Sequence, residues 1–518
     1  MLDSNNVLIA LGAACGIGFV TQLSLRLTST RISLPTSPKW YPLIGHLLSM
    51  PQSNEHIGFI ELGKQLNTDI FSLTVLGKTI VVLNSRDHAI NLLHNRSSIY
   101  SDRSCPPMVT EPTLVNFSEL ISLLGYNERW KKSRRLMHPQ LNKQASKSFH
   151  ESQEREARLL LQRLMSITEQ VDSSEELYQE FFRTLANTLM YTIYGYHLHD
   201  LNDPILKEVL QLVENLSRAA MPTNFLVNVF PSLRYVPEWL PGAGWKKTAR
   251  EWRIQYETTV KGLFDWTKAR VDSGADEASM IVSFLAEGAK LGLSGEELDD
   301  YVSKIAMTLF LGGAETTANT FLGFVMAMML YPDVQRRAQE EIGTIIGTSR
   351  LPELEDRPLL PYTNRLIQEV LRWCPAVPIG VPHATTNEDI YQGFRIPKGA
   401  MVIGNIWAMS RDEKIYKSPE EFNPDRFLDP LVPPCPVFGF GRRECPGVHF
   451  ADSSLFIVIA SILSAFNICV PKNADGEDVV PKLESENTIV FHPNEFRVKV
   501  ELRAARSFDS HGGMNPVI

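Results

Sequence analysis

Residues 438–447 read Phe-Gly-Phe-Gly-Arg-Arg-Glu-Cys-Pro-Gly, and this decapeptide says more about the fold than any other stretch of the chain. Its cysteine, Cys445, has what a metal-binding thiolate needs, because helix N-termini, guanidinium groups and backbone amides lower the pKa of a thiol. Arg442 and Arg443 supply positive charge. Residues 448–463 are largely apolar and predict a helix, which puts Cys445 at its positive end. The stretch therefore predicts a haem-thiolate site.

The spacing Phe-x-x-Gly-x-Arg-x-Cys-x-Gly is formed by Phe438, Gly441, Arg443, Cys445 and Gly447. The glycines permit tight turns and close approach of the backbone to a flat ligand. Two other interpretations are weaker: an isolated cysteine is usually a small buried hydrophobe, and the Gly-x-Gly pair lacks the third glycine of a dinucleotide site. The pattern resembles the cysteine-ligand loop of cytochromes P450. This resemblance implies haem b as the cofactor, Cys445 as the axial ligand of its iron and O2 as a co-substrate.

Length and composition indicate one large catalytic domain with a sizeable core. The chain has 518 residues, 44% of them hydrophobic, and no internal repeat or low-complexity tract divides it. Its net charge of -8 argues against a nucleic-acid partner, which usually leaves a basic footprint. Its six cysteines form no Cys-x-x-Cys pair, so structural zinc, iron-sulfur clusters and a disulfide framework are not expected.

The N-terminal residues 1–25 are expected to form a single transmembrane anchor. Residues 4–25 carry no charge, and roughly 20 apolar residues suffice to span a bilayer. A cleaved signal peptide is the alternative, but the residues before the apolar run include Asp3 and no lysine or arginine.

Positive charges follow the expected anchor, at Arg26, Arg31 and Lys39. The positive-inside rule then leaves the rest of the chain in the cytosol. We interpret residues 26–46 as a proline-containing hinge and residues 47–518 as the haem domain. With the resemblance to microsomal cytochromes P450, this predicts a location in the endoplasmic reticulum membrane, with the catalytic domain facing the cytosol.

Short strand patterns occur near the two ends of the chain, and helical periodicity dominates the residues between them. Residues 71–75 and 79–83 flank Leu76-Gly77-Lys78 and predict a hairpin. Residues 496–503 alternate between apolar and polar and predict a half-buried strand. We therefore expect a mainly α fold with small peripheral sheets, as the cytochrome P450 fold would have.

A very long helix is expected from a capping box at Ser294 to the residue before Pro332. Two adjacent glycines stand in its middle, and each costs roughly 1 kcal/mol relative to alanine. A close contact between helices would explain them as well as a function would. The run Gly312-Gly313-Ala314-Glu315-Thr316 also resembles the distal oxygen-binding motif of cytochromes P450. The resemblance implies that Gly312 and Gly313 approach the porphyrin and that Glu315 and Thr316 deliver protons.

Two further segments resemble the structural triad of the family. Glu369 and Arg372 stand three residues apart in a predicted helix and would ordinarily form a surface ion pair worth under about 1 kcal/mol. Phe422 and Arg426 belong to a Phe-Asn-Pro-Asp-Arg-Phe run further along. The resemblance implies that Glu369, Arg372 and Arg426 interlock as a buried network that serves folding and haem retention.

Residues 130–134, Trp-Lys-Lys-Ser-Arg, resemble the helix that contacts the haem propionates in the family. Arg134 offers a bidentate fork and Trp130 an indole donor. Lys131, Lys132 and Arg135 fit a solvated basic face, where an acidic reductase could dock. His383 stands where many cytochromes P450 carry a propionate-binding arginine, a departure that leaves its role open.

The substrate pocket is predicted only from the resemblance to the cytochrome P450 family. An ordinary packed core would have the same apolar residues in its sequence. The apolar residues in the corresponding stretches are Phe310, Ala314, Ile379, Val381 and Ile489. The aromatic and proline-rich residues 224–245 form either a membrane-dipping segment or a plain surface loop.

The expected reaction is insertion of one oxygen atom into a C–H bond, with electrons from a separate NADPH-cytochrome P450 reductase. The chain is similar to fungal microsomal cytochromes P450 of secondary metabolism, including the tryptamine hydroxylase type and related basidiomycete enzymes. A terpenoid substrate is favoured, and a polyketide or an indole scaffold is the alternative. Two other functions stay open: a non-catalytic haem-binding or sensor protein, and an isomerase or dehydratase, which the presence of Glu315 and Thr316 disfavours.

Overall fold

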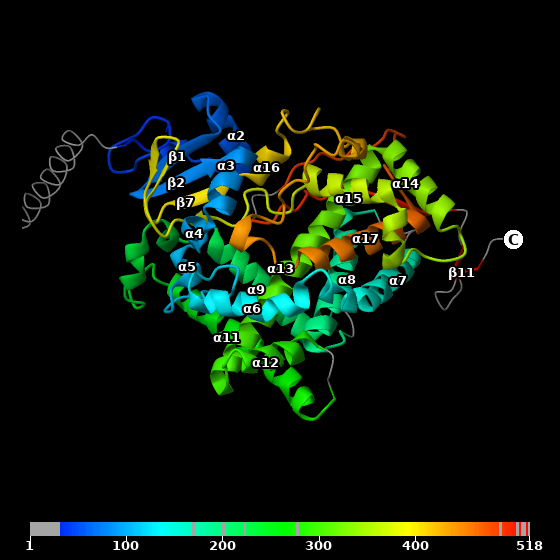
Figure 1. Ribbon diagram of the computed structural model, residues 1–518, viewed down its shortest axis with the longest axis horizontal. Coiled ribbons are helices and arrows are strands. Elements are labelled where there is room, and N and C mark those ends of the chain that lie inside the picture. The colour runs from blue at the N-terminus through cyan, green and yellow to red at the C-terminus, as the bar shows by residue number, and fades with distance from the viewer. Residues whose placement is uncertain are drawn as a thin grey trace, which may run out of the picture.

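The computed structural model describes residues 32–167, 172–198, 202–221, 224–275, 279–485 and 489–503, together with the backbone of 507–508 and 514–515. Helices dominate this part of the chain, as predicted (Figure 1). The α-helices are α2 (Glu55–Leu66), α3 (Arg86–Ala89), α4 (Ser97–Tyr100), α5 (Pro107–Thr110), α6 (Glu128–Leu141), α7 (His150–Ile167), α8 (Ser174–Tyr194), α9 (Pro204–Ala220), α10 (Leu226–Val229), α11 (Trp245–Asp272), α12 (Met280–Lys290), α13 (Gly295–Leu330), α14 (Pro332–Ile345), α15 (Pro361–Trp373), α16 (Ile406–Ser410) and α17 (Val448–Ala465). Shorter turns are η1 (Leu47–Ser49), the π-helix η2 (Ile90–Asn95), η3 (Ala145–Phe149), η4 (Pro231–Tyr235), η5 (Leu354–Leu359), η6 (Pro424–Leu428) and η7 (Gly441–Arg443).

The sheets are small and lie beside the helical body. In the described part of the chain, the largest sheet has five strands in the order β1-β2-β7-β4-β3, in which β2 and β7 are parallel. Its strands are β1 (Ile70–Val75), β2 (Lys78–Leu83), β3 (Asp102–Arg103), β4 (His383–Ala384) and β7 (Met401–Gly404). The other pairs are β5 (Asp389–Tyr391) with β6 (Phe394–Ile396), β8 (Phe466–Cys469) with β9 (Lys499–Leu502), and β10 (Ser507–Phe508) with β11 (Met514–Asn515).

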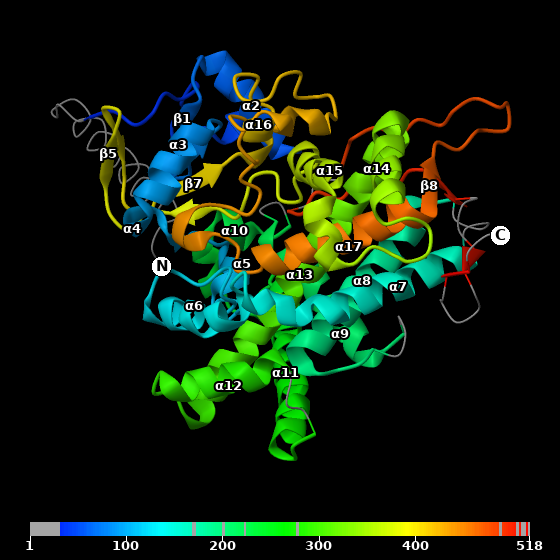
Figure 2. The same cartoon turned by 45° about the vertical axis from the view of Figure 1, so that its right-hand side comes forward.

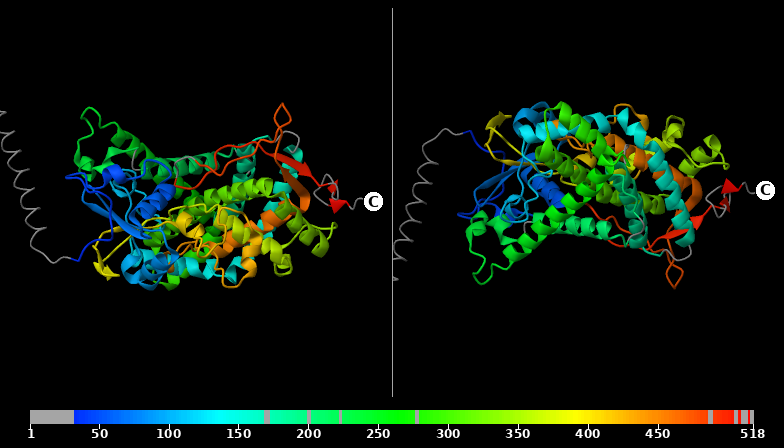
Figure 3. Two further views of the ribbon diagram at one scale, coloured as in Figure 1. Left: turned by 90° about the horizontal axis from the view of Figure 1, so that it is seen from above. Right: turned by 90° about the horizontal axis from the view of Figure 1, so that it is seen from below.

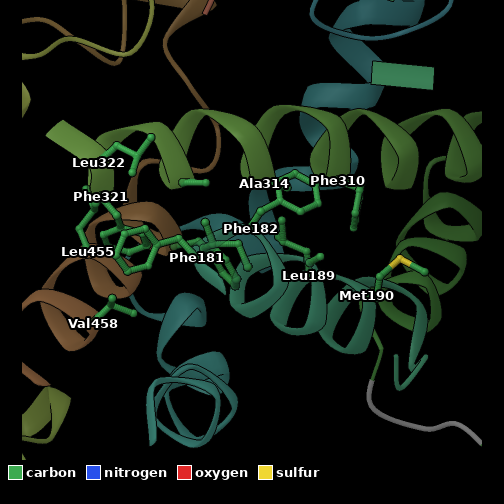
Figure 4. Close-up of a cluster of buried hydrophobic side chains, with 14 of the residues drawn as sticks. Phe181, Phe182, Leu189, Met190, Phe310, Ala314, Phe321, Leu322, Leu455 and Val458 are labelled. Carbon is green, nitrogen blue, oxygen red and sulfur yellow. The ribbon is translucent and has the colours of Figure 1, made fainter. Parts of the chain in front are cut away.

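The long helix α13 runs through the middle of the molecule and packs against both α8 and α17 (Figures 1 and 2). Aromatic contacts hold α8 to α13, since the rings of Phe181 and Phe321 lie 5.2 Å apart. Leu455 and Val458 of α17 complete this cluster (Figure 4). The core thus supports α13 from two sides, close to the segment predicted to face the cofactor.

The structure confirms several predicted elements and corrects one detail. Helix α13 covers Gly295–Leu330 and helix α17 covers Val448–Ala465. The hairpin β1–β2 turns at Leu76 and Gly77, which both have positive φ. The predicted capping box is wrong, because the Ser294 side chain makes no cap hydrogen bond.

The expected anchor and the first hinge residues lie outside the described residues. The rest of the hinge is fastened to the sheet: the Ser72 amide donates to the carbonyl of Thr36 at 2.8 Å, and the His46 amide donates to that of Thr74 at 2.7 Å. Within the described ranges, α17 alone is long and apolar enough to cross a membrane, and its side chains are mostly buried in the protein.

Candidate active site

The cysteine loop is shaped by its glycines. Gly439 has φ +84° and Gly441 has φ +55°, and a Cβ on Gly441 would lie 2.6 Å from the carbonyl oxygen of Leu93. Side chains are therefore excluded at Gly441 by both conformation and contact. The Cys445 amide donates to the carbonyl of Phe438 at 2.8 Å, which closes the loop just before α17.

The surroundings of the Cys445 thiol set its pKa. Its side chain has accessible surface, yet the surrounding protein desolvates it enough to raise its pKa. The Gly447 amide, which donates to the sulfur, and the Arg134 guanidinium oppose this shift and favour the thiolate, whereas Glu444 adds to it. Accessible surface combined with desolvation is what a thiol would show if it faced a space inside the protein.

The source of positive charge differs from the prediction. Arg442 donates to the Tyr126 hydroxyl, and Arg443 is buried with its guanidinium bound to the carbonyls of Ser101 at 2.6 Å and Leu124 at 2.7 Å. Neither of them lowers the pKa of the thiol, whereas Arg134 on α6 does. Sequence proximity to the cysteine was a poor guide, because Arg134 reaches it from more than 300 residues away.

The two glycines of α13 serve different contacts. Gly312 is exposed although it stands mid-way along a largely buried helix, and a Cβ built on it would meet no atom within 4 Å. A Cβ on Gly313 would instead lie 3.0 Å from the Leu189 side chain of α8. The helix-contact explanation therefore holds for Gly313, whereas Gly312 faces open space that a flat ligand could fill.

The predicted proton-delivery residues follow directly. The Thr316 hydroxyl donates to the Gly312 carbonyl at 2.8 Å, so it is held beside the open face of α13. Glu315 is half-buried, and desolvation raises its pKa above the usual range for a carboxylic acid. Among the described residues it has no hydrogen-bond or ion-pair partner. A half-buried, desolvated acid without a fixed partner can take up and release a proton.

Cationic groups gather at one end of the site, around a buried tryptophan. The guanidinium carbon of Arg443 lies 4.4 Å from the Trp130 ring centroid, and that of Arg134 lies 5.8 Å from it. Burial, together with the charges of Arg103 and Arg134, lowers the pKa of Arg443 to about 9. Such a cluster of partly desolvated cations suits a doubly anionic group.

Arg103 is a member of this cluster that sequence reasoning missed. Its guanidinium donates to the carbonyls of Val381 at 2.5 Å and Pro382 at 3.1 Å, and burial lowers its pKa to about 10. It stands in the two-residue strand β3 with no motif around it. No local pattern could have marked it.

His383 lies beside Arg103 in β4 and is buried. Its Nδ1 donates to the carbonyl of Tyr100 at 2.6 Å. Burial, assisted by Arg103 and Arg443, lowers its pKa to about 3, so the imidazole is neutral. The structure therefore supplies positive charge here through Arg103 and Arg443, and a propionate contact by His383 stays a prediction.

The triad residues meet as expected and are buried. The Arg372 guanidinium forms two hydrogen bonds of 2.7 Å to Glu369, and Arg426 Nε donates to Glu369 Oε1 at 2.9 Å. Phe422 is buried against Tyr331 and Trp373.

A buried tyrosine connects this network to the segment that leads into the cysteine loop. Arg372 lies over the ring of Tyr416, whose hydroxyl donates to the carbonyl of Pro433 at 3.0 Å. A shift of the triad side chains would therefore displace the backbone near the start of that loop.

The five predicted pocket residues occupy different surroundings. Phe310 and Ala314 are buried in the main core on α13 (Figure 4), and Ile379 packs against a separate small cluster that includes Phe59 and Phe71. Val381 and Ile489 are each 37% exposed. Their lining of one pocket stays a prediction.

The chain matches the cytochrome P450 family model over residues 35–500. It belongs to the cytochrome P450 family. A cytochrome P450 monooxygenase of Armillaria gallica is 35% identical over 92% of this chain and 93% of that relative. Cytochrome P450 monooxygenase 58 of Postia placenta is 36% identical over 96% of this chain and 93% of that relative. A zebrafish cytochrome P450 structure with abiraterone, 25% identical, has a TM-score of 0.70 and covers 86% of this chain and 99% of its own.

The protein is accordingly a haem-thiolate monooxygenase. The residues of this cytochrome P450 fit the cofactor: Cys445 is a thiol with accessible surface, Gly312 leaves an open face on α13, and Arg103, Arg134 and Arg443 would form a cationic end for the propionates. When bound, the haem supplies the oxygen-activating chemistry.

The contribution of Arg134 to haem retention can be tested against its neighbour. Arg134→Gln is expected to speed haem release by about tenfold or more, since a charge-assisted hydrogen bond contributes about 1.5–3 kcal/mol. Haem transfer to excess apomyoglobin measures this rate. Arg135→Gln, at an exposed position of the same helix, should leave it unchanged. Equal rates of haem release from the two variants would show that Arg134 does not help to bind the haem.

Proposed function

We propose that this cytochrome P450 hydroxylates a lipophilic secondary metabolite, with a terpenoid as the favoured class. The observation that carries the proposal is the apolar character of α13 beside the open glycine, where the half-buried leucines Leu309 and Leu311 precede Gly312. An apolar wall binds hydrocarbon scaffolds and excludes water. Two fungal relatives, which are cytochrome P450 monooxygenases 35% and 36% identical to this chain, support an oxygenase function for the proposed site.

The chain's own residues divide the remaining work. Cys445 would hold the haem iron, and Arg134, Arg443 and Trp130 would hold the propionate end of the cofactor. Glu315 holds a proton and passes it to the site, and the Thr316 hydroxyl positions the donor. The role of the protein is thus to orient the substrate and to time proton delivery.

Replacing Thr316 by alanine is expected to leave haem binding intact and to lower the yield of product per NADPH by about tenfold or more. The reason is that Oγ1 sits beside Gly312, where protons are needed, while contributing little to packing. The ratio of product to hydrogen peroxide measures the effect. Thr320→Ala, one turn further along α13, is the matched control. Full coupling in the Thr316 variant would refute the proton-delivery role.

Electrons are proposed to come from a membrane-bound NADPH-cytochrome P450 reductase. The basic residues Lys131, Lys132 and Arg135 lie on α6, the helix that also carries Arg134 toward the cysteine loop. Positive charge on this helix favours encounter with an acidic flavoprotein domain. Salt dependence of the reduction rate would report this docking.

Attachment to the endoplasmic reticulum is proposed from the apolar N-terminus and from exposed apolar side chains in the domain. Leu43 and Leu48 near the N-terminus, and Tyr235 and Trp239 after α10, are between 69% and 89% exposed. The two regions lie at the same end of the molecule (Figure 3). Such surfaces suit partial insertion into a lipid interface.

Removal of residues 1–33 is expected to release the protein from membranes in part and to leave the haem domain folded. The physical reason is that two hydrogen bonds to the sheet remain, from the Ser72 amide to the Thr36 carbonyl and from the His46 amide to the Thr74 carbonyl. Carbon monoxide spectra and flotation with liposomes measure the two properties. Loss of haem on truncation would contradict a simple anchor.

The substrate class is tested by feeding. Microsomes containing the protein and a reductase are given terpenoid, polyketide and indole scaffolds, with product mass as the readout. A mass gain of one oxygen on a terpenoid supports the proposal. Oxidation confined to polyketides or indoles would overturn the terpenoid assignment.

A further inference from the structure

A line of polar side chains leads from the protein surface to the acid of α13. It begins at Glu175 in the first turn of α8, whose side chain is 48% exposed. His492 follows, with its Nε2 3.8 Å from Glu175 Oε2. Its other nitrogen, Nδ1, lies 2.6 Å from Oδ1 of Asn319, which is 1% exposed. Three residues thus cover the path from solvent to the buried face of α13.

The far end of this line is Glu315, because it precedes Asn319 by four residues and so stands one helical turn away on the same face. Tyr178 of α8 lies beside the path, with its ring 4.8 Å from that of His492. The charges of both Glu315 and Glu175 raise the pKa of Tyr178, after desolvation as the largest cause. The phenol is therefore within electrostatic reach of both carboxylates.

One donor on this path has no partner. Asn319 Nδ2 is buried and meets no hydrogen-bond acceptor among the residues that the structure describes. A buried N–H of this kind is normally satisfied by an ordered water. A water bound there would accept from Asn319, one helical turn after Glu315 on the same face of α13.

We propose that His492 is the relay residue that carries protons from Glu175 at the surface to Glu315, with Tyr178 and Asn319 lining the path. This rests on the proposed proton-delivery role of Glu315. Solvent protonates His492 at Nε2, beside the Glu175 carboxylate. Nδ1 then releases its proton, through water ordered beside Asn319, to a carboxyl oxygen of Glu315. This leaves the neutral ring with its proton on Nε2, and loss of that proton to solvent with reprotonation at Nδ1 restores the starting tautomer. Each step moves one proton and no electrons.

The groups around His492 favour proton transfer through its ring. Glu175 and Tyr178 face it from α8, and Asn319 faces it from α13, where Glu315 stands one turn earlier and acts on the pKa of Tyr178. The charges of its own segment are otherwise engaged: Glu495 accepts from Ser173 at 2.5 Å, and Arg497 pairs with Asp172 at 2.8 Å. An imidazolium at this point would pair with the Glu175 carboxylate and donate to Asn319, and the neutral ring can accept a new proton from solvent.

Infrared spectroscopy of the haem-loaded full-length protein tests the relay without turnover. The protonated carboxyl band of Glu315 is assigned by its loss in Glu315→Gln, and its shift on transfer to deuterium oxide gives the exchange rate. His492→Gln keeps a donor to Asn319 but cannot carry a proton, so exchange should slow by about tenfold or more. His138→Gln, at an exposed position of α6, should not change the rate.

A second variant separates proton transfer from structural support. His492→Glu can carry a proton, although Glu175 repels its charge and makes it the poorer structural substitute. The relay predicts faster exchange in His492→Glu than in His492→Gln. Equal rates in wild type and His492→Gln, or faster exchange in His492→Gln than in His492→Glu, would overturn the relay and leave Glu315 in place. If Glu315→Gln removed no band, both the relay and the proposed role of Glu315 would fall.

Discussion

Glu369→Ala is expected to destabilise the haem domain by about 3–5 kcal/mol, because it leaves two buried guanidinium groups without their carboxylate. Glu369 accepts from Arg372, Arg426 and the amide of Asn423, and its side chain is fully buried. No other acidic side chain among the described residues pairs with either arginine. The loss also reaches the cysteine loop through Tyr416 and Pro433, so haem should be lost together with structure.

Urea unfolding followed by haem absorbance and by circular dichroism measures this change. Glu214→Ala is the matched control, because Glu214 pairs with Arg218 on the surface of α9 and both side chains are more than half exposed. Exposed pairs of this kind contribute about 0–1 kcal/mol. A Glu369 variant that behaved like the Glu214 variant would contradict the structural role of the triad.

Cys445→Ser is expected to abolish the thiolate-type spectrum of the reduced carbon monoxide complex and to reduce oxygenation to background. A serine hydroxyl at this position is not a thiolate donor, and the electron donation that favours O–O cleavage is lost with the sulfur. Expression with ample porphyrin followed by reduced carbon monoxide spectroscopy measures the change.

The control for this variant is another cysteine of the same segment. Cys435 is buried, and burial raises the pKa of its thiol to about 12, so it stays a neutral side chain of the core. Cys435→Ser should keep the thiolate spectrum. Retention of that spectrum in Cys445→Ser, or its loss in Cys435→Ser alone, would show that a residue other than Cys445 binds the haem iron.

Local patterns were sufficient where one segment determines the outcome. The length of α13 follows from an apolar run that ends at Pro332, and α17 follows from the apolar run after the cysteine loop. The hairpin follows from turn chemistry at Leu76 and Gly77. These features depend on neighbours in sequence, so period and turn residues predict them.

Contacts between distant segments could not be read in the same way. Two adjacent glycines look alike in sequence, yet Gly313 packs on Leu189 and Gly312 faces open space. Arg442 and Arg443 flank the cysteine, yet Arg134 acts on its thiol. The approach of His492 to Asn319 joins residues 173 positions apart. Such contacts follow from the packing of whole helices, which no local pattern records.

The sulfur of Cys445 is expected to bond to the haem iron, and X-ray absorption at the iron edge of the haem-loaded protein detects that bond. We expect one sulfur atom among the nearest neighbours of the iron, absent in Cys445→Ser. An iron surrounded by nitrogen and oxygen alone in the unaltered protein would contradict it.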